Sequence, residues 1–172
     1  MNMAVYERGD GCIKSLDFTD AAAVNFEPAS TFVGDNEEYF FVIETLKKLC
    51  PKAIPDYVRM LFMDTISANP DRHTNNFGLL RDIKTGEIIG FAPNYDNNMA
   101  LISRGYPSKT KSKDMLISVF NELLDEYPTC RSYIPVLTEG IVSEVIEKIN
   151  MKVKSKVIID MVIDRYNACK LK

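Results

Sequence analysis

A polar segment between a helical pattern and a strand pattern constrains the fold of this chain most. The segment Asn69–Gly78 reads NPDRHTNNFG. Before it, apolar residues recur at helical spacing between Tyr57 and Ile66, after a helix start near Pro55. Pro70 pushes the preceding residue out of the helical region, so the helix should end there. A loop held by regular structure on both sides is a common place for a functional site.

The segment after this loop has the pattern of a β-hairpin. Two short apolar runs flank a turn at Thr85-Gly86, which predicts a hairpin over residues 77–92. A second polar turn, at 93–98, follows directly. Because a hairpin brings its entrance and exit to the same end, we expect the loop at 69–76 and the turn at 93–98 to converge.

The remaining pattern is mainly helical. Asp35 and Glu38 resemble a capping box before a helix that Pro51 closes. Residues 1–31 have no sustained period and are expected to form a loop or a short strand. Amphipathic stripes predict three further helices, at Ser112–Tyr127, Thr138–Asn150 and Val153–Lys170. The predicted fold class is α+β, mainly α.

Composition excludes several classes of protein. The chain has 172 residues, which suits one domain with a real core or two thin subdomains. A net charge of −3 argues against a dedicated nucleic-acid binder. Four dispersed cysteines and a single histidine argue against a zinc or redox motif. No apolar run has the length of a membrane span, and no secretory signal pattern opens the chain, so a cytoplasmic location is expected.

Three side chains of the two polar turns suit phosphoryl transfer. Magnesium prefers oxygen ligands, and the Asp96 carboxylate and the Asn76 amide oxygen would supply two. Asp71 would then accept a proton from the attacking hydroxyl. An aspartate, an asparagine five residues later and a second, metal-binding aspartate are the parts that this chemistry uses.

These motifs resemble the catalytic core of the HipA-like kinases. The matching strings are NPDRHTNNFGLL and, after a short hairpin, APNYD. That family of bacterial serine/threonine kinases is distantly similar to phosphatidylinositol 3- and 4-kinases. The resemblance implies Asp71 as the catalytic aspartate, Asn76 and Asp96 as ligands of Mg²⁺ that also bind ATP, and a structural role for His73. It further implies that 35–172 is a protein-kinase-like C-terminal lobe whose hairpin carries the active site, and that 1–34 is a lead-in segment near the interlobe hinge.

The chain departs from that family in two respects. Many members have a lysine just before the metal-binding asparagine, where this chain has Asn75. The only G-x-G string is Gly9-Asp-Gly11, without the context of a phosphate loop, and Lys14 lies in no strand of the expected kind. We therefore expect the N-terminal lobe to be absent, which makes the chain a fragment, a short relative or half of a split kinase.

Simpler interpretations of the same residues remain open. Asp71, Asn76 and Asp96 are also common turn residues. Arg72 would either contact a carboxylate or approach a phosphate. The basic run Arg104–Lys113 fits a solvated loop, and the resemblance also suits an activation or substrate loop there.

Two functions follow as hypotheses. The first is an ATP- and Mg²⁺-dependent kinase that acts on a protein hydroxyl. The alternative is a truncated, non-catalytic lobe that binds a partner in a toxin–antitoxin or phage-derived regulatory setting. A metal-dependent hydrolase is weaker, because one histidine gives no histidine-rich ligand set. Expected partners are a protein substrate, an antitoxin-like protein, a separate N-lobe or a second copy of the chain, with no membrane and only indirect nucleic-acid contact.

Overall fold

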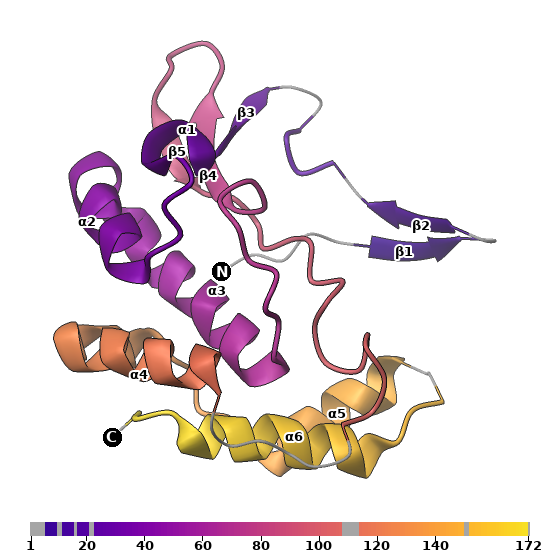
Figure 1. The fold of residues 1–172 in the computed structure, drawn as a ribbon. Helices are drawn as coiled ribbons and strands as arrows, with labels where there is room; N and C mark the ends of the chain where they lie inside the picture. Colours follow the sequence, from indigo (N-terminus) through magenta and orange to yellow (C-terminus); the bar gives the residue numbers. More distant parts are fainter. Residues whose placement is uncertain are drawn as a thin grey trace. The chain divides into compact units, whose positions relative to one another are not determined.

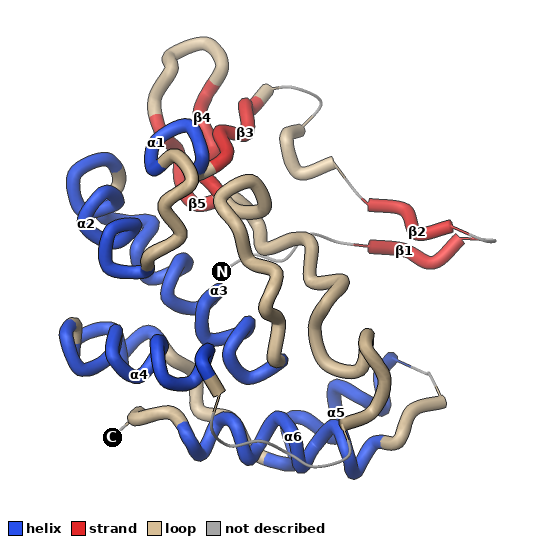
Figure 2. Tube along the Cα trace, viewed as in Figure 1, coloured by secondary structure: helices blue, strands red, loops and turns tan. Residues whose placement is uncertain are grey.

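The computed structural model describes residues 6–9, 12–15, 17–20, 23–107, 114–149 and 152–171. About half of the chain is helical, and strands make up a smaller part (Figures 1 and 2). The chain forms two compact units: Met1–Met60 with Arg72–Asp96, and Leu61–Asp71 with Asn97–Lys172. The prediction of a mixed, helix-rich chain with a small β-structure is confirmed. No helix in the described ranges is both long and apolar enough to cross a membrane.

The first unit contains a three-stranded antiparallel sheet in the order β3–β4–β5. The strands are β3 Val24–Pro28, β4 Gly78–Asp82 and β5 Ile88–Phe91. The predicted hairpin is therefore confirmed as β4 and β5. Its turn is fixed by the Asp82 carboxylate, which accepts hydrogen bonds from the backbone amides of Lys84 and Thr85 at 2.8 Å each. These amide bonds, that from Thr85 first, hold the pKa of Asp82 below its usual value.

The sequence pattern did not predict β3 as a partner of this hairpin. β3 pairs with β4 from Val24 opposite Asp82 to Pro28 opposite Gly78. At Gly78 the backbones approach so closely that a Cβ atom would lie 2.1 Å from the carbonyl oxygen of Glu27. Glycine is thus required at the start of β4 for the third strand to dock. Residues on both sides of position 34, the predicted limit of the lead-in segment, belong to the first unit.

Two further strands lie near the N-terminus. β1 Tyr6–Gly9 and β2 Cys12–Ser15 form a separate antiparallel pair. Lys14 lies in β2, and the expectation that this is not the strand of an ATP-binding lysine stays a prediction. Gly11, the second glycine of the G-x-G string, lies outside the described residues.

Three α-helices and one 3₁₀ turn follow β3 in the sequence, before β4. They are α1 Ser30–Val33, α2 Tyr39–Leu49, the 3₁₀ turn η1 Pro51–Ala53 and α3 Ile54–Ser67. The predicted capping box is wrong, because the N-cap of α2 is Glu38 and no side chain caps the helix. The Asn36 side chain instead accepts a hydrogen bond from the Glu38 amide at 3.0 Å. The end of α3 before Pro70 agrees with the prediction.

Aromatic residues form the core of the first unit. Tyr57 of α3 is 1% exposed, and its ring centroid lies 5.5 Å from that of Phe77 and 6.2 Å from that of Phe91. The Phe77 and Phe91 rings stack at 6.3 Å. These contacts fix the end of the polar loop, at Phe77, and the start of the polar turn, after Phe91, against one helix.

The second unit is helical. Beyond the C-terminal part of α3 it contains α4 Met115–Glu126, the 3₁₀ segment η2 Pro128–Tyr133, α5 Glu139–Ile149 and α6 Ser155–Ala168. The three predicted C-terminal helices are confirmed, although Ser112 and Asn150, predicted as terminal residues, lie outside the described residues. Lys109, Lys111 and Lys113 of the predicted basic run also lie outside them. The Phe62 ring packs against Phe120 and Tyr166, with centroids 6.1 Å away in each case.

A buried arginine joins three helices of this unit. Arg165 of α6 is 3% exposed. Its Nε donates to the Thr65 carbonyl oxygen near the end of α3 at 2.6 Å, and its two terminal nitrogens donate to the Asp114 carboxylate. Asp114 also caps α4 by accepting from the Ile117 amide at 3.1 Å. Burial alone would raise the pKa of Asp114, but the hydrogen bonds from Arg165 and Ile117 outweigh it and lower the pKa.

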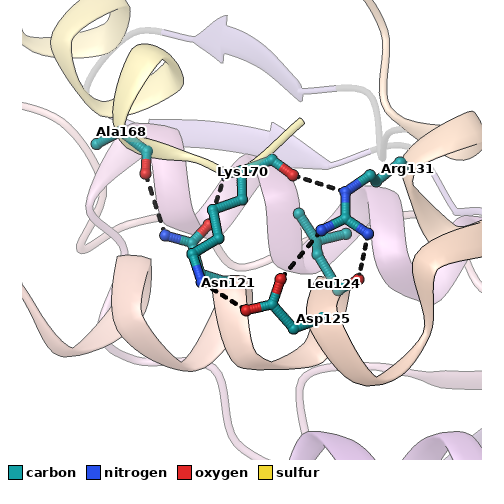
Figure 3. A network of polar contacts seen from close by, with 6 residues as sticks. All are labelled: Asn121, Leu124, Asp125, Arg131, Ala168 and Lys170. Atoms are coloured by element: carbon teal, nitrogen blue, oxygen red, sulfur yellow. Dashed lines mark hydrogen bonds and ion pairs between the residues drawn. The ribbon is translucent and has the colours of Figure 1, made fainter. Parts of the chain in front are cut away.

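A second polar cluster holds the C-terminal residues against α4 (Figure 3). Arg131 donates from Nε to the Lys170 carbonyl oxygen at 2.8 Å and from Nη2 to Asp125 at 3.1 Å. The Lys170 ammonium pairs with Asp125 at 2.5 Å, and its hydrogen bond is the main reason that the pKa of Asp125 is lowered. Asn121 exchanges hydrogen bonds with the Ala168 carbonyl and the Lys170 amide.

Candidate functional site

The polar loop begins in the second unit. Asn69 is fully buried; its side-chain nitrogen donates to Asp64 at 2.8 Å and its side-chain oxygen accepts from the Asp71 amide at 3.4 Å. Asp71 is exposed and is the last residue of the segment Leu61–Asp71. The buried Asn69 thus fixes the backbone from which the predicted catalytic carboxylate projects.

Arg72 joins the two polar segments within the first unit. Its Nη1 donates to the carbonyl oxygen of Asn76 at 3.0 Å and to that of Tyr95 at 2.9 Å. The Tyr95 hydroxyl in turn donates to the carbonyl oxygen of Asn75 at 2.7 Å. Residues 20 or more positions apart are therefore in direct contact. The structure brings together the loop that carries Asn76 and the turn that carries Asp96, as expected at one end of a hairpin. The sequence analysis offered a carboxylate or a phosphate as the partner of Arg72. These two hydrogen bonds instead go to backbone carbonyl oxygens.

The predicted metal-binding amide is built into its own turn. Asn76 is 2% exposed. Its side-chain oxygen accepts from the His73 amide at 3.1 Å, and its backbone amide donates to the His73 carbonyl at 3.0 Å. The Nδ1 atom of His73 accepts from the Asn75 amide at 3.3 Å. The backbone and the ring of His73 thus both bond to the two residues Asn75 and Asn76, as a structural role would require.

Asp96 adopts an unusual backbone conformation. Its φ angle is 55°, in the left-handed region that aspartate tolerates better than most residues. The preceding residue, Tyr95, is held by two aromatic rings, with centroids 5.8 Å from Phe18 and 5.6 Å from Phe26. The left-handed backbone of Asp96 and the packed ring of Tyr95 before it together fix the direction in which the Asp96 carboxylate projects from the turn.

Sequence reasoning missed two residues of this region. The Ser30 hydroxyl donates to the Asn75 side-chain oxygen at 2.7 Å, and the Ser30 amide donates to the Thr74 carbonyl at 2.9 Å. Asn94 is 2% exposed, and neither polar atom of its side chain has a hydrogen-bond partner among the described residues. No sequence pattern before β4 indicates that Ser30 would contact the polar loop. Asn94 stands inside the APNYD string, in the polar turn predicted at 93–98.

The donors available for a cation are oxygens. Within the described ranges no group of three histidine, cysteine, aspartate or glutamate side chains is arranged to hold a metal. The predicted ligand pair is of another kind, one amide oxygen from Asn76 and one carboxylate from Asp96. These are donors that Mg²⁺ accepts when phosphate oxygens and water complete its shell. The roles of Asp71, Asn76 and Asp96 remain predictions.

Comparisons with known proteins support the fold. No known protein family matches the sequence, and no curated protein matches it. Among solved structures, the chain is similar to the Helicobacter pylori proinflammatory kinase CtkA, with a TM-score of 0.65. The sequence identity is 15%, and the match covers 91% of this chain and 72% of that one. The chain thus has a fold similar to that of a kinase, as predicted. Membership of the HipA-like family remains a prediction.

Proposed function

We propose that the chain is the catalytic lobe of a serine/threonine kinase of the HipA-like type, which transfers phosphate from ATP to a protein hydroxyl. The observation that carries the proposal is the bridge from Arg72 to the carbonyls of Asn76 and Tyr95. It connects the two motifs that the resemblance pairs, across a hairpin whose geometry the sequence predicted. The similarity in fold to a solved kinase supports it independently.

The residues fit this chemistry in their donor atoms and in how the backbone holds them. The Asn76 oxygen and the Asp96 carboxylate would hold Mg²⁺, which neutralises charge on the phosphates when bound. An amide oxygen has two acceptor positions, so the hydrogen bond from the His73 amide is compatible with a cation on the same atom. The unpartnered, buried amide of Asn94, two residues before Asp96, is the kind of group that a bound ligand or water satisfies.

Asp71 would act as the proton acceptor. Its side chain is exposed, so a protein hydroxyl can reach it. Phosphoryl transfer depends mainly on positioning and on charge neutralisation, and an aspartate carboxylate can fill this role. Asn75 stands where many members of that family have a lysine; its amide can donate a hydrogen bond to a phosphate but supplies no positive charge. ATP, Mg²⁺ and a protein substrate are therefore parts of the proposal, as is an antitoxin-like partner.

Calorimetric titration with Mg²⁺-ATP tests the proposal. We expect the wild type to bind, Asp96→Asn to lose the Mg²⁺-dependent heat, and Asp71→Asn to keep binding but lose phosphate transfer to a protein acceptor. Asp160→Asn, an aspartate of α6 paired with Lys156, is the matched control and should resemble wild type. If wild type and Asp96→Asn both give no heat at millimolar nucleotide, the chain is the non-catalytic, partner-binding lobe instead.

A further inference from the structure

The second unit contains an apolar cavity that plays no part in the proposed reaction. Its volume is about 380 Å³, within the range of small-molecule sites, which is roughly 300–1,000 Å³. Its wall is formed by the end of α3, the loop at 101–102, α5, the residues before α6, and α6 itself. Figure 1 shows α5 and α6 side by side.

The lining has almost no hydrogen-bonding capacity. Met63, Ile102, Val145, Ile149 and Val153 are representative of its side chains. The one hydroxyl, of Ser67, already donates to the Met63 carbonyl at 2.6 Å. A nucleotide, a sugar or an extended peptide would leave polar groups unpaired there, so the part of the occupant inside the cavity must be apolar.

Part of this lining is exposed, which differs from the expectation for a buried helical stripe. Val142 and Ile146 of α5 are buried, but Val145 is 53% and Ile149 is 55% exposed. Residues three and four positions apart share a helix face, so these side chains form one apolar strip along the cavity. Large apolar side chains kept at the mouth of a cavity indicate a ligand or partner.

The cavity volume favours a chain over a helix. A helix is about 10 Å across, so about one turn would fill this space. If a methylene takes about the 30 Å³ that a water molecule occupies in the liquid, the cavity holds about a dozen. One linear aliphatic chain of medium length therefore matches it.

Cations flank the lining residues. Lys152 and Lys154 stand on either side of Val153, and Arg104 follows Ile102 by two positions. All three are exposed, and none has a carboxylate partner in the part of the chain that the structure describes. The Lys154 ammonium lies 5.0 Å from the centroid of the Tyr106 ring, and its backbone amide donates to the Tyr106 hydroxyl at 2.8 Å.

Of the acids of α5, Glu144 is neutralised by a cation of its own helix, whereas Glu147 is bonded to a neutral hydroxyl. Glu144 pairs with Lys148 at 2.6 Å, and Glu147 accepts a hydrogen bond from Ser143 at 3.4 Å. We infer that the cavity between α5, α6 and the loop at 101–102 binds the aliphatic chain of a free fatty acid, with its carboxylate near Lys152 and Lys154.

Titration of the full chain with dodecanoate below its micelle concentration tests this inference. We expect saturable binding of one molecule per chain, weakened about tenfold or more by Val145→Asp, which places a charge in the lining. Val136→Asp is the matched control, since Val136 is 76% exposed and does not line the cavity. Lys152→Gln combined with Lys154→Gln should weaken dodecanoate and leave dodecanol unchanged.

Three results would overturn the inference. They are an absence of saturable binding, equal effects of Val145→Asp and Val136→Asp, and dodecyltrimethylammonium binding as tightly as dodecanoate. A chain that self-associates through this strip, with dissociation by Val145→Asp and no dodecanoate binding, would assign the face to a second copy instead. Because every probe lacks phosphate and Mg²⁺, failure here leaves the proposed kinase activity untouched.

Discussion

Each unit contains an arginine that joins segments distant in sequence, and the two arginines use different partners. Arg165 in the second unit is 3% exposed and donates to the Asp114 carboxylate as well as to a backbone carbonyl. Arg72 in the first unit is partly exposed and bridges the carbonyls of Asn76 and Tyr95. The first is a buried ion pair, and the second is a clamp on loop backbone.

The difference separates a structural region from a candidate site. The Arg165 guanidinium is bonded to the Asp114 carboxylate and to a backbone carbonyl, so the arrangement joins helices. The acceptors of these two Arg72 bonds are backbone carbonyls of separate loops, so the bonds hold the loops to each other. The same unit keeps the unpartnered amide of Asn94 in its interior. Unsatisfied buried groups are rare in folded proteins and concentrate where function requires them.

Removing the carboxylate at Asp114 should have the largest effect. Asp114→Ala leaves the buried Arg165 charge unpaired and deletes the cap of α4, so we expect the free energy of unfolding to fall by about 3–5 kcal/mol. Urea denaturation measures this. Asp125→Ala is the control, because that carboxylate is half exposed in its ion pair with Lys170, and its loss should cost far less than the loss of Asp114. Equal losses in the two variants would refute the comparison.

Acid should lower the free energy of unfolding of the second unit, and part of this loss should depend on Asp114. Its pKa lies below the ordinary 3.8 in the folded chain, so the unfolded state binds a proton first as the pH falls. The stabilisation is complete above about pH 5 and is lost as the pH falls through the folded pKa. Asp114→Asn cannot ionise, so its free energy of unfolding should change less than that of wild type between pH 6 and pH 3. Parallel curves for the two proteins would show that Asp114 does not control acid sensitivity.

Periodicity and turn chemistry were sufficient to predict most of the fold. The apolar spacing of α3 and the turn at Thr85-Gly86 gave a helix and a hairpin that the structure confirms. β3 was missed because its pairing with β4 is a long-range contact, and VNFEP shows no clear alternation. The clue was Gly78, whose missing side chain admits the Glu27 carbonyl. A glycine at a strand start has several explanations, and only the third strand distinguishes them.

The candidate site was predicted by residue type and only partly by geometry. A hairpin must bring its two ends together, so the contact between the Asn76 loop and the Tyr95 turn followed from pattern. The partners of Arg72 did not, because a guanidinium binds carboxylates, phosphates and carbonyls alike. Ser30 was also beyond prediction, since it reaches Asn75 only after β3 has docked. Side-chain partners depend on tertiary contacts that local sequence does not record.

Breaking the Arg72 clamp should have a smaller effect than the change at Asp114. Arg72→Ala removes two charge-assisted hydrogen bonds from a partly exposed group, so we expect a loss of about 2 kcal/mol in the free energy of unfolding. Amide hydrogen exchange should speed up around Asn76 and Tyr95 and stay unchanged in α4. Arg72→Lys keeps the charge without the planar fork, and should restore less than half of the loss. Full rescue by lysine would mean that charge, and not the bridge, holds the two loops.

The smallest expected change, at Asn94, has the opposite sign. Asn94→Leu keeps the branched shape and removes an amide with no partner, so the free energy of unfolding should rise by about 1 kcal/mol. Asn69→Leu is the matched control: that amide is also buried but bonded to Asp64, and its loss should destabilise by about 1–3 kcal/mol. If both variants destabilise equally, an internal water satisfies Asn94 and the contrast between the two regions weakens. If Asn94→Leu is more stable but binds Mg²⁺-ATP less tightly, the unpaired amide belongs to the site, because a group kept at a cost to stability must act on something other than the fold.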